Sequence, residues 1–215
     1  MARGIKKIID ISVALGDGSI DYPGDTPFSY KTLCSLRKND PYDLTALSMS
    51  AHSGTHLDFP SHFLKNGRNT DGYPVSDFIL DAVVADIRDK KCVKPEEVER
   101  ISIPPGGAVL FKTMNSRTGR SANGEFYRHF VHLTAGAAEI CMKKKARLVG
   151  FDYITIDRYG ESEFPAHASL MKKNILILEG LNLRLVRPGW YRLICLPLKL
   201  KSREAAPARA ILVKL

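Results

Sequence analysis

The sequence predicts a single α/β or α+β domain, and three observations support this fold class. Short runs rich in aliphatic and β-branched residues outnumber the segments with helical periodicity. Hydrophobic residues occupy 44% of the 215 positions, which supplies one core, while the chain is too short for two full-sized domains. No segment approaches the roughly 18 uninterrupted apolar residues of a membrane span. We therefore assign residues 1–215 to one domain.

Eight segments have the composition of strands. Within residues 44–51, Leu47, Met49 and Ala51 alternate with Ala46, Ser48 and Ser50, a period of two residues that is typical of a strand. The segment at residues 80–87 is built around the apolar run at residues 82–85. The expected strands lie at residues 8–15, 44–51, 80–87, 108–113, 148–153, 175–179, 191–198 and 210–213. Periodicity does not fix their order in a sheet.

Helices are fewer than strands. Thr134 is a suitable N-cap for a segment that continues to the lysine triplet at residues 143–145. A second helix is expected over residues 166–173, ending before Asn174. Strands mixed with a few helices are typical of an α/β or α+β domain.

The four cysteines, Cys34, Cys92, Cys141 and Cys195, lie far apart and form no CxxC pair. Two widely spaced disulfides remain an alternative, but we expect reduced and mostly buried thiols in a chain of this size. Near the N-terminus, Asp10 interrupts any apolar core of a signal peptide. Both observations favour a cytoplasmic protein.

The net charge of +9 arises in the last third of the chain. Residues 1–140 hold 17 Lys and Arg against 17 Asp and Glu, whereas residues 141–215 hold 15 against 6. The excess is dispersed, and its densest run ends an expected helix, where cations complement the helix dipole. We therefore favour solvated surface charge over a nucleic-acid footprint, with attraction of an anionic small substrate as a second interpretation.

The most informative stretch, residues 50–63, reads SAHSGTHLDFPSHF. Three of the six histidines and one carboxylate fall within eleven positions: His52, His56, Asp58 and His62. Because the stretch follows a strand and contains Gly54 and Pro60, we expect a strand end and loop and not the helix of a zinc protease.

This cluster has the chemistry of a metal site. Gly54 permits a tight turn, so that His52 and His56 can converge on one point and Asp58 can add an oxygen ligand. Imidazole with carboxylate suits zinc, manganese or iron, and the lack of nearby thiols argues against a closed structural cysteine site. Spacing alone does not separate a catalytic from a structural metal. The alternative, hydrogen-bonded histidines in a loop, is disfavoured for so dense a cluster.

Two residues further along are candidate distant ligands. His167 lies near the start of an expected helix, and Glu179 ends an apolar run, where a buried carboxylate is costly unless paired or metal-bound. Taken alone, each is better explained in an ordinary way, His167 as a helix-start residue and Glu179 as a strand-end charge.

Four other polar residues carry weaker signals. His129 and His132 are three apart and would share one face of a helix, but nothing converges on them. Asp152 and Asp157 close a strand, where short acids often hold turns. Paired-carboxylate glycoside chemistry at these two acids would leave the histidine cluster without a role.

The chain resembles the metal-dependent cyclase-like hydrolases, a family that includes bacterial kynurenine formamidase (arylformamidase) and isatin hydrolase. The family pattern HxGTHxDxPxHF is matched in full over residues 52–63. Weaker similarity covers residues 9–12, 22–28, 150–152, Thr155, Asp157, His167, 177–181, 196–199 and 206–210. The resemblance therefore extends over almost the whole chain, although only the central pattern is highly specific.

The resemblance implies a fold of two small mixed β-sheets with flanking helices, the swivelling β/β/α architecture. It implies a divalent metal, zinc or manganese, bound by His52, His56 and Asp58. His167 and Glu179 would complete a second, adjacent metal position, giving one or two ions per subunit. A homodimer or homotetramer is also implied, with the loop at residues 22–25 near a neighbouring subunit's site.

The implied reaction is hydrolysis of an amide C–N bond, with N-formylkynurenine, an intermediate of tryptophan catabolism, as the nearest named substrate. A divalent ion makes hydroxide available at neutral pH and stabilises an oxyanion. His62 would be the acid/base residue that delivers a proton to the leaving nitrogen. Candidates for an aromatic substrate pocket are Tyr22, Phe59, Phe63 and Tyr73, each of which is equally well explained as a core or rim residue.

Two departures from the formamidase branch concern the substrate. Tyr22 stands where that branch usually has Trp, and Phe59 where it favours a small residue, which predicts a narrower pocket. The same chemistry on a cyclic amide or another small substrate is therefore an alternative. From a different class, a basic nucleic-acid-binding module with a structural metal predicts a clustered basic face; the dispersed charge disfavours it. We expect a small-molecule substrate and no nucleic-acid or membrane partner.

Overall fold

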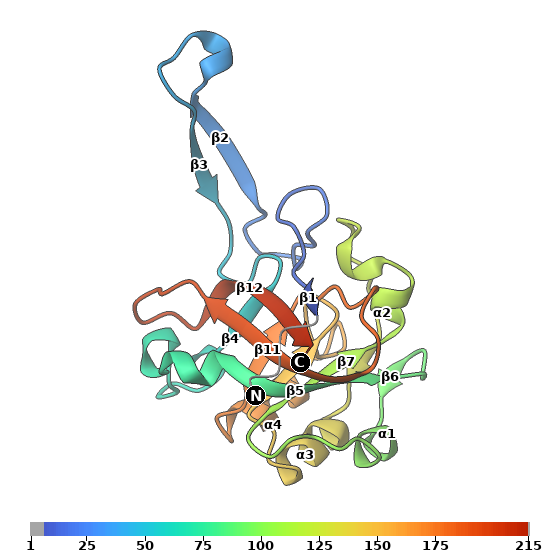
Figure 1. Cartoon of the computed structure of the whole chain (residues 1–215). Coiled ribbons are helices and arrows are strands. Elements are labelled where there is room, and N and C mark those ends of the chain that lie inside the picture. The colour runs from blue at the N-terminus through green and yellow to red at the C-terminus, as the bar shows by residue number, and fades with distance from the viewer. Residues whose placement is uncertain (1–6, 215) are drawn as a thin grey trace, which may run out of the picture.

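The computed structural model describes residues 7–214, in which a closed β-sheet carries helices on one side and a long hairpin projects from the opposite end (Figure 1). The main sheet has eight strands, in the spatial order β1 (Lys7–Asp10), β12 (Ala205–Lys214), β11 (Gly189–Pro197), β5 (Ile79–Asp86), β7 (Ala108–Lys112), β9 (Leu148–Phe151), β10 (Leu176–Glu179) and β4 (His56–Asp58). β4 also bonds to β12, so seven strands form a closed barrel and β1 extends β12 outside the ring.

The expectation of two small mixed sheets is therefore wrong, while the mixed α/β character is confirmed. The reason is β4, a strand of three residues that bonds to β10 on one side and to β12 on the other. Its residues lie far from both partners in the sequence, so no local pattern predicts that they join two sheets into one.

The four parallel strands β5, β7, β9 and β10 explain the apolar runs in the sequence. Along β5, Val83 and Ala85 face the core cluster under the helices, whereas Ala82 and Val84 face the other core cluster. Because both faces are covered, these strands are apolar throughout and do not alternate.

Four α-helices accompany the sheet, α1 (Pro95–Glu99), α2 (Met114–Arg117), α3 (Ala135–Lys143) and α4 (Pro165–Met171). α1, α3 and α4 lie together on one side of the barrel (Figure 1). The predicted cap of α3 is confirmed, since the Thr134 side chain accepts a hydrogen bond from the backbone of Ala137. Short helices α1 and α2 have no strong periodicity and were not expected.

All eight predicted strand segments contain a strand, although residues 8–15 are strand only as far as Asp10 and β12 begins five residues before its predicted start. The additional strands are β2 (Ser29–Cys34), β3 (Leu44–Ser48, within a predicted segment), β4, and the short parallel pair β6 (Cys92–Val93) and β8 (His132–Leu133). His129 and His132 do not share a helix, because this segment is a loop leading into β8.

The structure also bears on the cysteines and on the question of a membrane-spanning helix. All four cysteines are free thiols. Cys141 and Cys195 are buried and Cys34 and Cys92 only partly so, and the expectation of mostly buried thiols therefore holds for two of the four. No helix within residues 7–214 combines the length and apolar character needed to cross a bilayer.

The hairpin of β2 and β3, which we call the arm (residues 29–48), projects away from the barrel (Figure 1). Its two strands pair with each other and belong to no larger sheet. Six large hydrophobic side chains of the arm are exposed, namely Tyr30, Leu33, Leu36, Tyr42, Leu44 and Leu47. An isolated two-stranded hairpin is marginally stable in water, so this surface is suited to contact another molecule.

Candidate metal centre

The histidine-rich stretch folds as a turn followed by the barrel-closing strand. His52 lies in the turn, and Gly54 has a φ of +61°, a left-handed conformation that glycine adopts without strain. His56 and Asp58 are two residues apart on β4 and therefore lie on the same face of that strand. The turn and the strand together bring all three side chains to one place.

Glu179 reaches this place through strand pairing. β10 runs antiparallel to β4, and Glu179 lies directly opposite His56 in the register. The next residue, Gly180, has a φ of +66°, and a Cβ there would overlap the carbonyl group of Gly54. The close approach of the two segments therefore requires glycine at position 180, and the Thr55 hydroxyl secures it by donating to the Gly180 carbonyl at 2.5 Å.

His167 approaches from the helical side. It is the third residue of α4, a helix that begins at Pro165. The buried carboxylate of Asp157 accepts hydrogen bonds from the backbone N–H groups of Ala166 (2.8 Å) and His167 (3.0 Å), two donors that the first turn of the helix leaves unsatisfied. Asp157 thus fixes where the helix begins and where His167 points.

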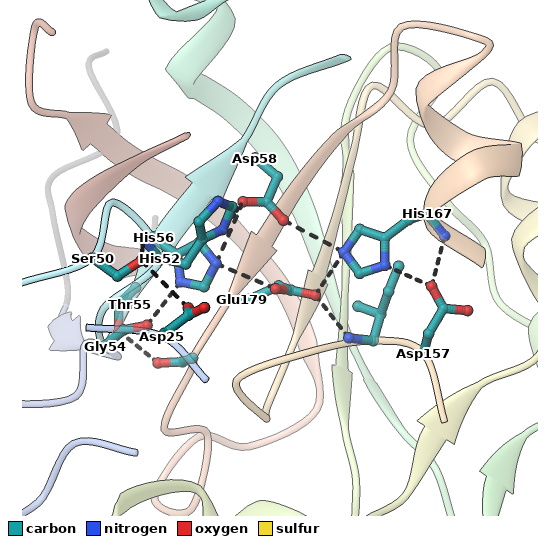
Figure 2. Close-up of polar contacts among 12 residues, drawn as sticks. Asp25, Ser50, His52, Gly54, Thr55, His56, Asp58, Asp157, His167 and Glu179 are labelled. Atoms are coloured by element: carbon teal, nitrogen blue, oxygen red, sulfur yellow. Dashed lines mark hydrogen bonds and ion pairs between the residues drawn. The ribbon is translucent and has the colours of Figure 1, made fainter. Parts of the chain in front are cut away.

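The imidazoles of His52, His56 and His167 gather around the carboxylates of Asp58 and Glu179 (Figure 2). An oxygen of Asp58 lies 2.9 Å from His52 Nδ1 and 3.4 Å from His56 Nε2, and its other oxygen lies 3.4 Å from His167 Nε2. Glu179 lies 3.2 Å from both His56 Nε2 and His167 Nε2. The arrangement forms two trios, His52–His56–Asp58 and Asp58–His167–Glu179, which share Asp58.

Two of the imidazoles are oriented by a hydrogen bond on the far side of the ring. His56 Nδ1 lies 3.0 Å from the Gly54 carbonyl oxygen, which can only accept, so Nδ1 carries the proton. His167 Nδ1 lies 2.6 Å from Asp157. In both rings Nε2 then faces the carboxylates and is the atom available to a metal ion, which is how metal-binding histidines are usually held.

The donor atoms fit a divalent metal ion. His56 Nε2 and both carboxylate oxygens of Asp58 are buried, yet none has a hydrogen-bond partner of acceptable geometry among residues 7–214. Buried polar atoms without partners are costly, and atoms aimed at a shared point gain their partner when that point holds a cation. Imidazole nitrogens and carboxylate oxygens are the ligand types that zinc and manganese accept.

The charges in the cluster lead to the same conclusion. Burial lowers the pKa of His52, but the Asp58 carboxylate outweighs this and raises it to about 9. Burial likewise acts to lower the pKa of His167, yet Glu179 and Asp157 raise it well above its ordinary value. For Asp58, burial acts to raise the pKa, and the adjacent His52 and His56 hold it well below the usual range. The buried carboxylates therefore attract positive charge, which a metal supplies while displacing protons.

A cavity of about 300 Å³ opens beside these residues. The proposed acid/base residue, His62, lies at its exposed rim, with its ring centroid 4.4 Å from that of His52. The lining residues are Tyr22, Asp25, His52, His62, Phe63, Ile154, Thr155, Phe164, His167 and Glu179. No lysine or arginine of residues 7–214 is among them, so the positive net charge does not reside in this cavity.

The structure divides the four candidate pocket aromatics into two pairs. Tyr22 and Phe63 line the cavity. Phe59 and Tyr73 instead contact each other in the second core cluster, with ring centroids 5.3 Å apart. Phe59 therefore does not narrow the cavity, because on β4 and its continuation it points away from the face that carries His56 and Asp58. Loop residues Tyr22 and Asp25 line the cavity of their own subunit.

Asp152, which the sequence also singles out, has a structural role. Asp152 is buried and accepts hydrogen bonds from the backbone and hydroxyl of Thr113 at 2.7 Å and from the backbone of Ser116 at 3.1 Å. It holds the start of α2, in agreement with a turn-stabilising acid, and it is absent from both metal-ligand trios.

Sequence reasoning missed the role of Asp157, which was interpreted as a turn residue. Replacing Asp157 with Asn keeps one acceptor for the helix start but removes the charge that orients His167. We expect metal affinity to fall about 10- to 100-fold, the usual effect of losing such an orienting partner. Competition of the variant with a metal chelator measures this change, and an affinity equal to that of the parent would contradict the assignment.

The family can now be stated. The family model described as "Putative cyclase" matches residues 9–158, and the chain belongs to this cyclase family. The kynurenine formamidase of Bacillus anthracis is 34% identical over 206 residues, covering 96% of this chain and 97% of the relative.

Solved structures agree in fold. A potential metal-dependent hydrolase with cyclase activity has a TM-score of 0.83 at 28% identity, covering 97% of this chain and 98% of that one. Isatin hydrolase A from Labrenzia aggregata has a TM-score of 0.81 at 23% identity, with 96% and 93% coverage, and this similarity concerns the fold alone.

Proposed function

We propose that this protein is a metal-dependent hydrolase of amide C–N bonds, with N-formylkynurenine as its substrate and kynurenine and formate as products. The observation that carries the proposal is the pair of interlocked histidine–carboxylate trios beside an aromatic-lined cavity. The relatives named kynurenine formamidase support the substrate, since they match the chain over nearly its full length.

The ligand assignment follows from the two trios. His52, His56 and Asp58 would hold one divalent ion, and Asp58, His167 and Glu179 a second, with Asp58 shared between them. Zinc and manganese both suit this set of nitrogen and oxygen donors. When bound, such an ion lowers the pKa of water far enough to make hydroxide available at neutral pH, and it polarises a carbonyl group.

The chain's own residues would carry out the rest of the reaction. Tyr22 and Phe63 contribute aromatic surface for the aryl ring of the substrate. Water would add to the formyl carbon and give one proton to His62 at the rim. His62 would return that proton to the nitrogen as the C–N bond breaks, so that the amine leaves neutral and the formyl group leaves as formate, its remaining acidic proton passing to solvent. Substrate binding would cover the exposed His62 and exclude water from the cavity.

The deciding experiment measures metal content and N-formylkynurenine hydrolysis in the same preparation. We expect one or two equivalents of zinc or manganese per subunit and turnover that chelation abolishes and metal restores. Bound metal with hydrolysis of isatin in place of N-formylkynurenine would transfer the proposal to a cyclic amide. The absence of metal after reconstitution would refute the ligand assignment.

We also propose that the protein is a homodimer or a pair of such dimers, in which the arm of one subunit contacts the other. Tyr30 and Leu47 lie opposite each other in the arm and are 70% and 61% exposed. The base of the arm adjoins a groove of about 490 Å³ that includes Leu196 and Leu198, themselves half exposed. Burying these apolar surfaces against a second copy would stabilise the assembly.

Sedimentation velocity tests this assembly. Leu47→Glu is expected to shift the protein toward monomer, because the charge would be buried in the interface. Leu185→Glu is the matched control, since Leu185 is 85% exposed on a loop of the barrel and lies outside the arm. A parent protein that sediments as a monomer would contradict the proposal.

A further inference from the structure

Phe164 adopts a backbone conformation that is unfavourable for a bulky side chain. Its φ and ψ are 44° and 60°, in the left-handed region where the Cβ of an L-residue crowds the following carbonyl oxygen. Four other non-glycine residues within 7–214 have positive φ, and all are polar: Asn39, Lys145, Asn174 and Ser202. Among the five non-glycine residues of 7–214 with positive φ, Phe164 is therefore the apolar one. Asn, which occupies two of these five positions, tolerates the conformation best.

The backbone role of Phe164 does not explain the choice of residue. Position 164 precedes α4, and its carbonyl oxygen accepts the backbone N–H of Ala168 at 2.9 Å. Its side chain makes no capping hydrogen bond to the helix. Glycine or asparagine would serve the same turn with less steric conflict, so the reason for phenylalanine lies in its ring.

The ring of Phe164 forms part of the cavity wall beside the metal centre. It lines the cavity and lies 5.5 Å, between centroids, from Phe63. Phe63 in turn stacks on His167 at 5.0 Å with 29° between the planes. Two flat rings thus adjoin a candidate metal ligand, at the side of the cavity that the helix α4 contributes.

We propose that Phe164 is a specificity-determining residue, whose ring gives the cavity a flat wall that favours planar aromatic amides over saturated rings of equal size. The proposal rests on the proposed function for the reaction, but the binding preference does not require turnover. Offset or edge-to-face contact with an aryl ring adds to simple burial, whereas a puckered ring is too thick for the same contact. The strained backbone is the cost of aiming the ring into the cavity.

The test compares the hydrolysis and binding of planar aromatic amides with those of saturated-ring amides by the metal-loaded protein. Formanilide and N-cyclohexylformamide are the substrates, and acetanilide and N-cyclohexylacetamide are the binding probes for calorimetry. In Phe164→Asn, which keeps the backbone conformation, the kcat/KM ratio of formanilide to N-cyclohexylformamide should fall about three- to tenfold, mainly through KM. Acetanilide affinity should weaken by a similar factor, with N-cyclohexylacetamide little changed.

Three further variants keep the result interpretable. Phe164→Tyr retains a flat ring and should retain both preferences. Phe164→Leu keeps apolar volume without the ring and should lose them, which covers the case in which Phe164→Asn loses metal or fold. Lys145→Asn makes the same replacement at another positive-φ position, away from the cavity, and should change neither preference.

The outcomes separate the two proposals. If the parent binds acetanilide in preference to N-cyclohexylacetamide and Phe164→Asn or Phe164→Leu abolishes this preference, the role of Phe164 is supported even without turnover. If the parent protein hydrolyses neither formanilide nor N-cyclohexylformamide, the proposed reaction is refuted. The inference about Phe164 is then still decided by the binding measurements. Unchanged preferences in a folded, metal-loaded Phe164→Leu would overturn the inference.

Discussion

Asp58→Asn is expected to yield a folded protein with little or no bound metal and with hydrolysis reduced about a thousandfold or more, since metal-assisted activation of water would be lost. Both oxygens of Asp58 are buried without a hydrogen bond of acceptable geometry to any residue of 7–214, and the two candidate trios share this one residue. Asparagine has the same volume but supplies one oxygen and no charge, so neither trio would be complete. Elemental analysis and circular dichroism on the same sample measure metal content and fold.

Glu204→Gln is the matched control for this variant. Glu204 also lies beside the cluster, with Oε1 3.8 Å from His52 Nε2, but it is partly exposed and belongs to neither trio. It should keep its metal and most of its activity. A fully metal-loaded Asp58→Asn would refute the assignment of Asp58 as a shared ligand.

His62→Ala is expected to show the opposite combination, namely full metal content and turnover reduced about 10²- to 10⁴-fold, the usual contribution of general acid–base catalysis. His62 lies at the cavity rim and belongs to neither trio of close donor atoms. Its loss should therefore affect proton delivery while leaving the ion in place. The matched control is His129→Ala, which removes an exposed histidine outside the cavity.

Varying the leaving amine of the substrate tests the role of His62 as proton donor more sharply. Because His62 is assigned as the donor to the leaving nitrogen, a formanilide with a para-nitro group, whose amine leaves readily without a proton, should lose much less activity in His62→Ala than unsubstituted formanilide. An equal loss for both substrates would indicate that His62 acts in some other step. Loss of metal from His62→Ala would place it among the ligands.

The convergence of the first candidate trio, His52, His56 and Asp58, could be predicted from the sequence because its geometry is local. His52, Gly54, His56 and Asp58 lie within seven residues, so a turn and a two-residue period are enough to place them together. The predicted loop is confirmed only for residues 51–55, since residues 56–58 form β4 and residues 60–62 form a short 3-10 helix.

The second trio could not be predicted from local pattern. Glu179 reaches the cluster because it pairs with His56 across two strands separated by more than a hundred residues, and this register is a property of the closed barrel. The chain pattern offers His167 and Glu179 only as candidate ligands with a preferred ordinary interpretation, and the family resemblance reverses that preference. The separation of Phe59 from Phe63 has a similar origin, since it depends on which side of β4 faces the core.

The arm and Asp157 show two further limits of the sequence. The exposed apolar residues of the arm have the composition of a core, and nothing in their order shows that they face solvent in a single subunit. For Asp157, a short acid after a strand suits a turn equally well, and its bond to His167 depends on the placement of α4.

The closure of the barrel by β4 has a consequence for local unfolding. His56 and Asp58 flank Leu57, which is fully buried, on the three-residue strand that links β10 to β12. Separation of this short strand from either neighbour opens the ring by breaking a ladder of only three residue pairs, which makes it a candidate site for sub-global opening. An ion that binds the closed form stabilises it by mass action. Amide hydrogen exchange along β4 therefore reports metal occupancy directly, and protease resistance of the whole barrel should rise with metal concentration.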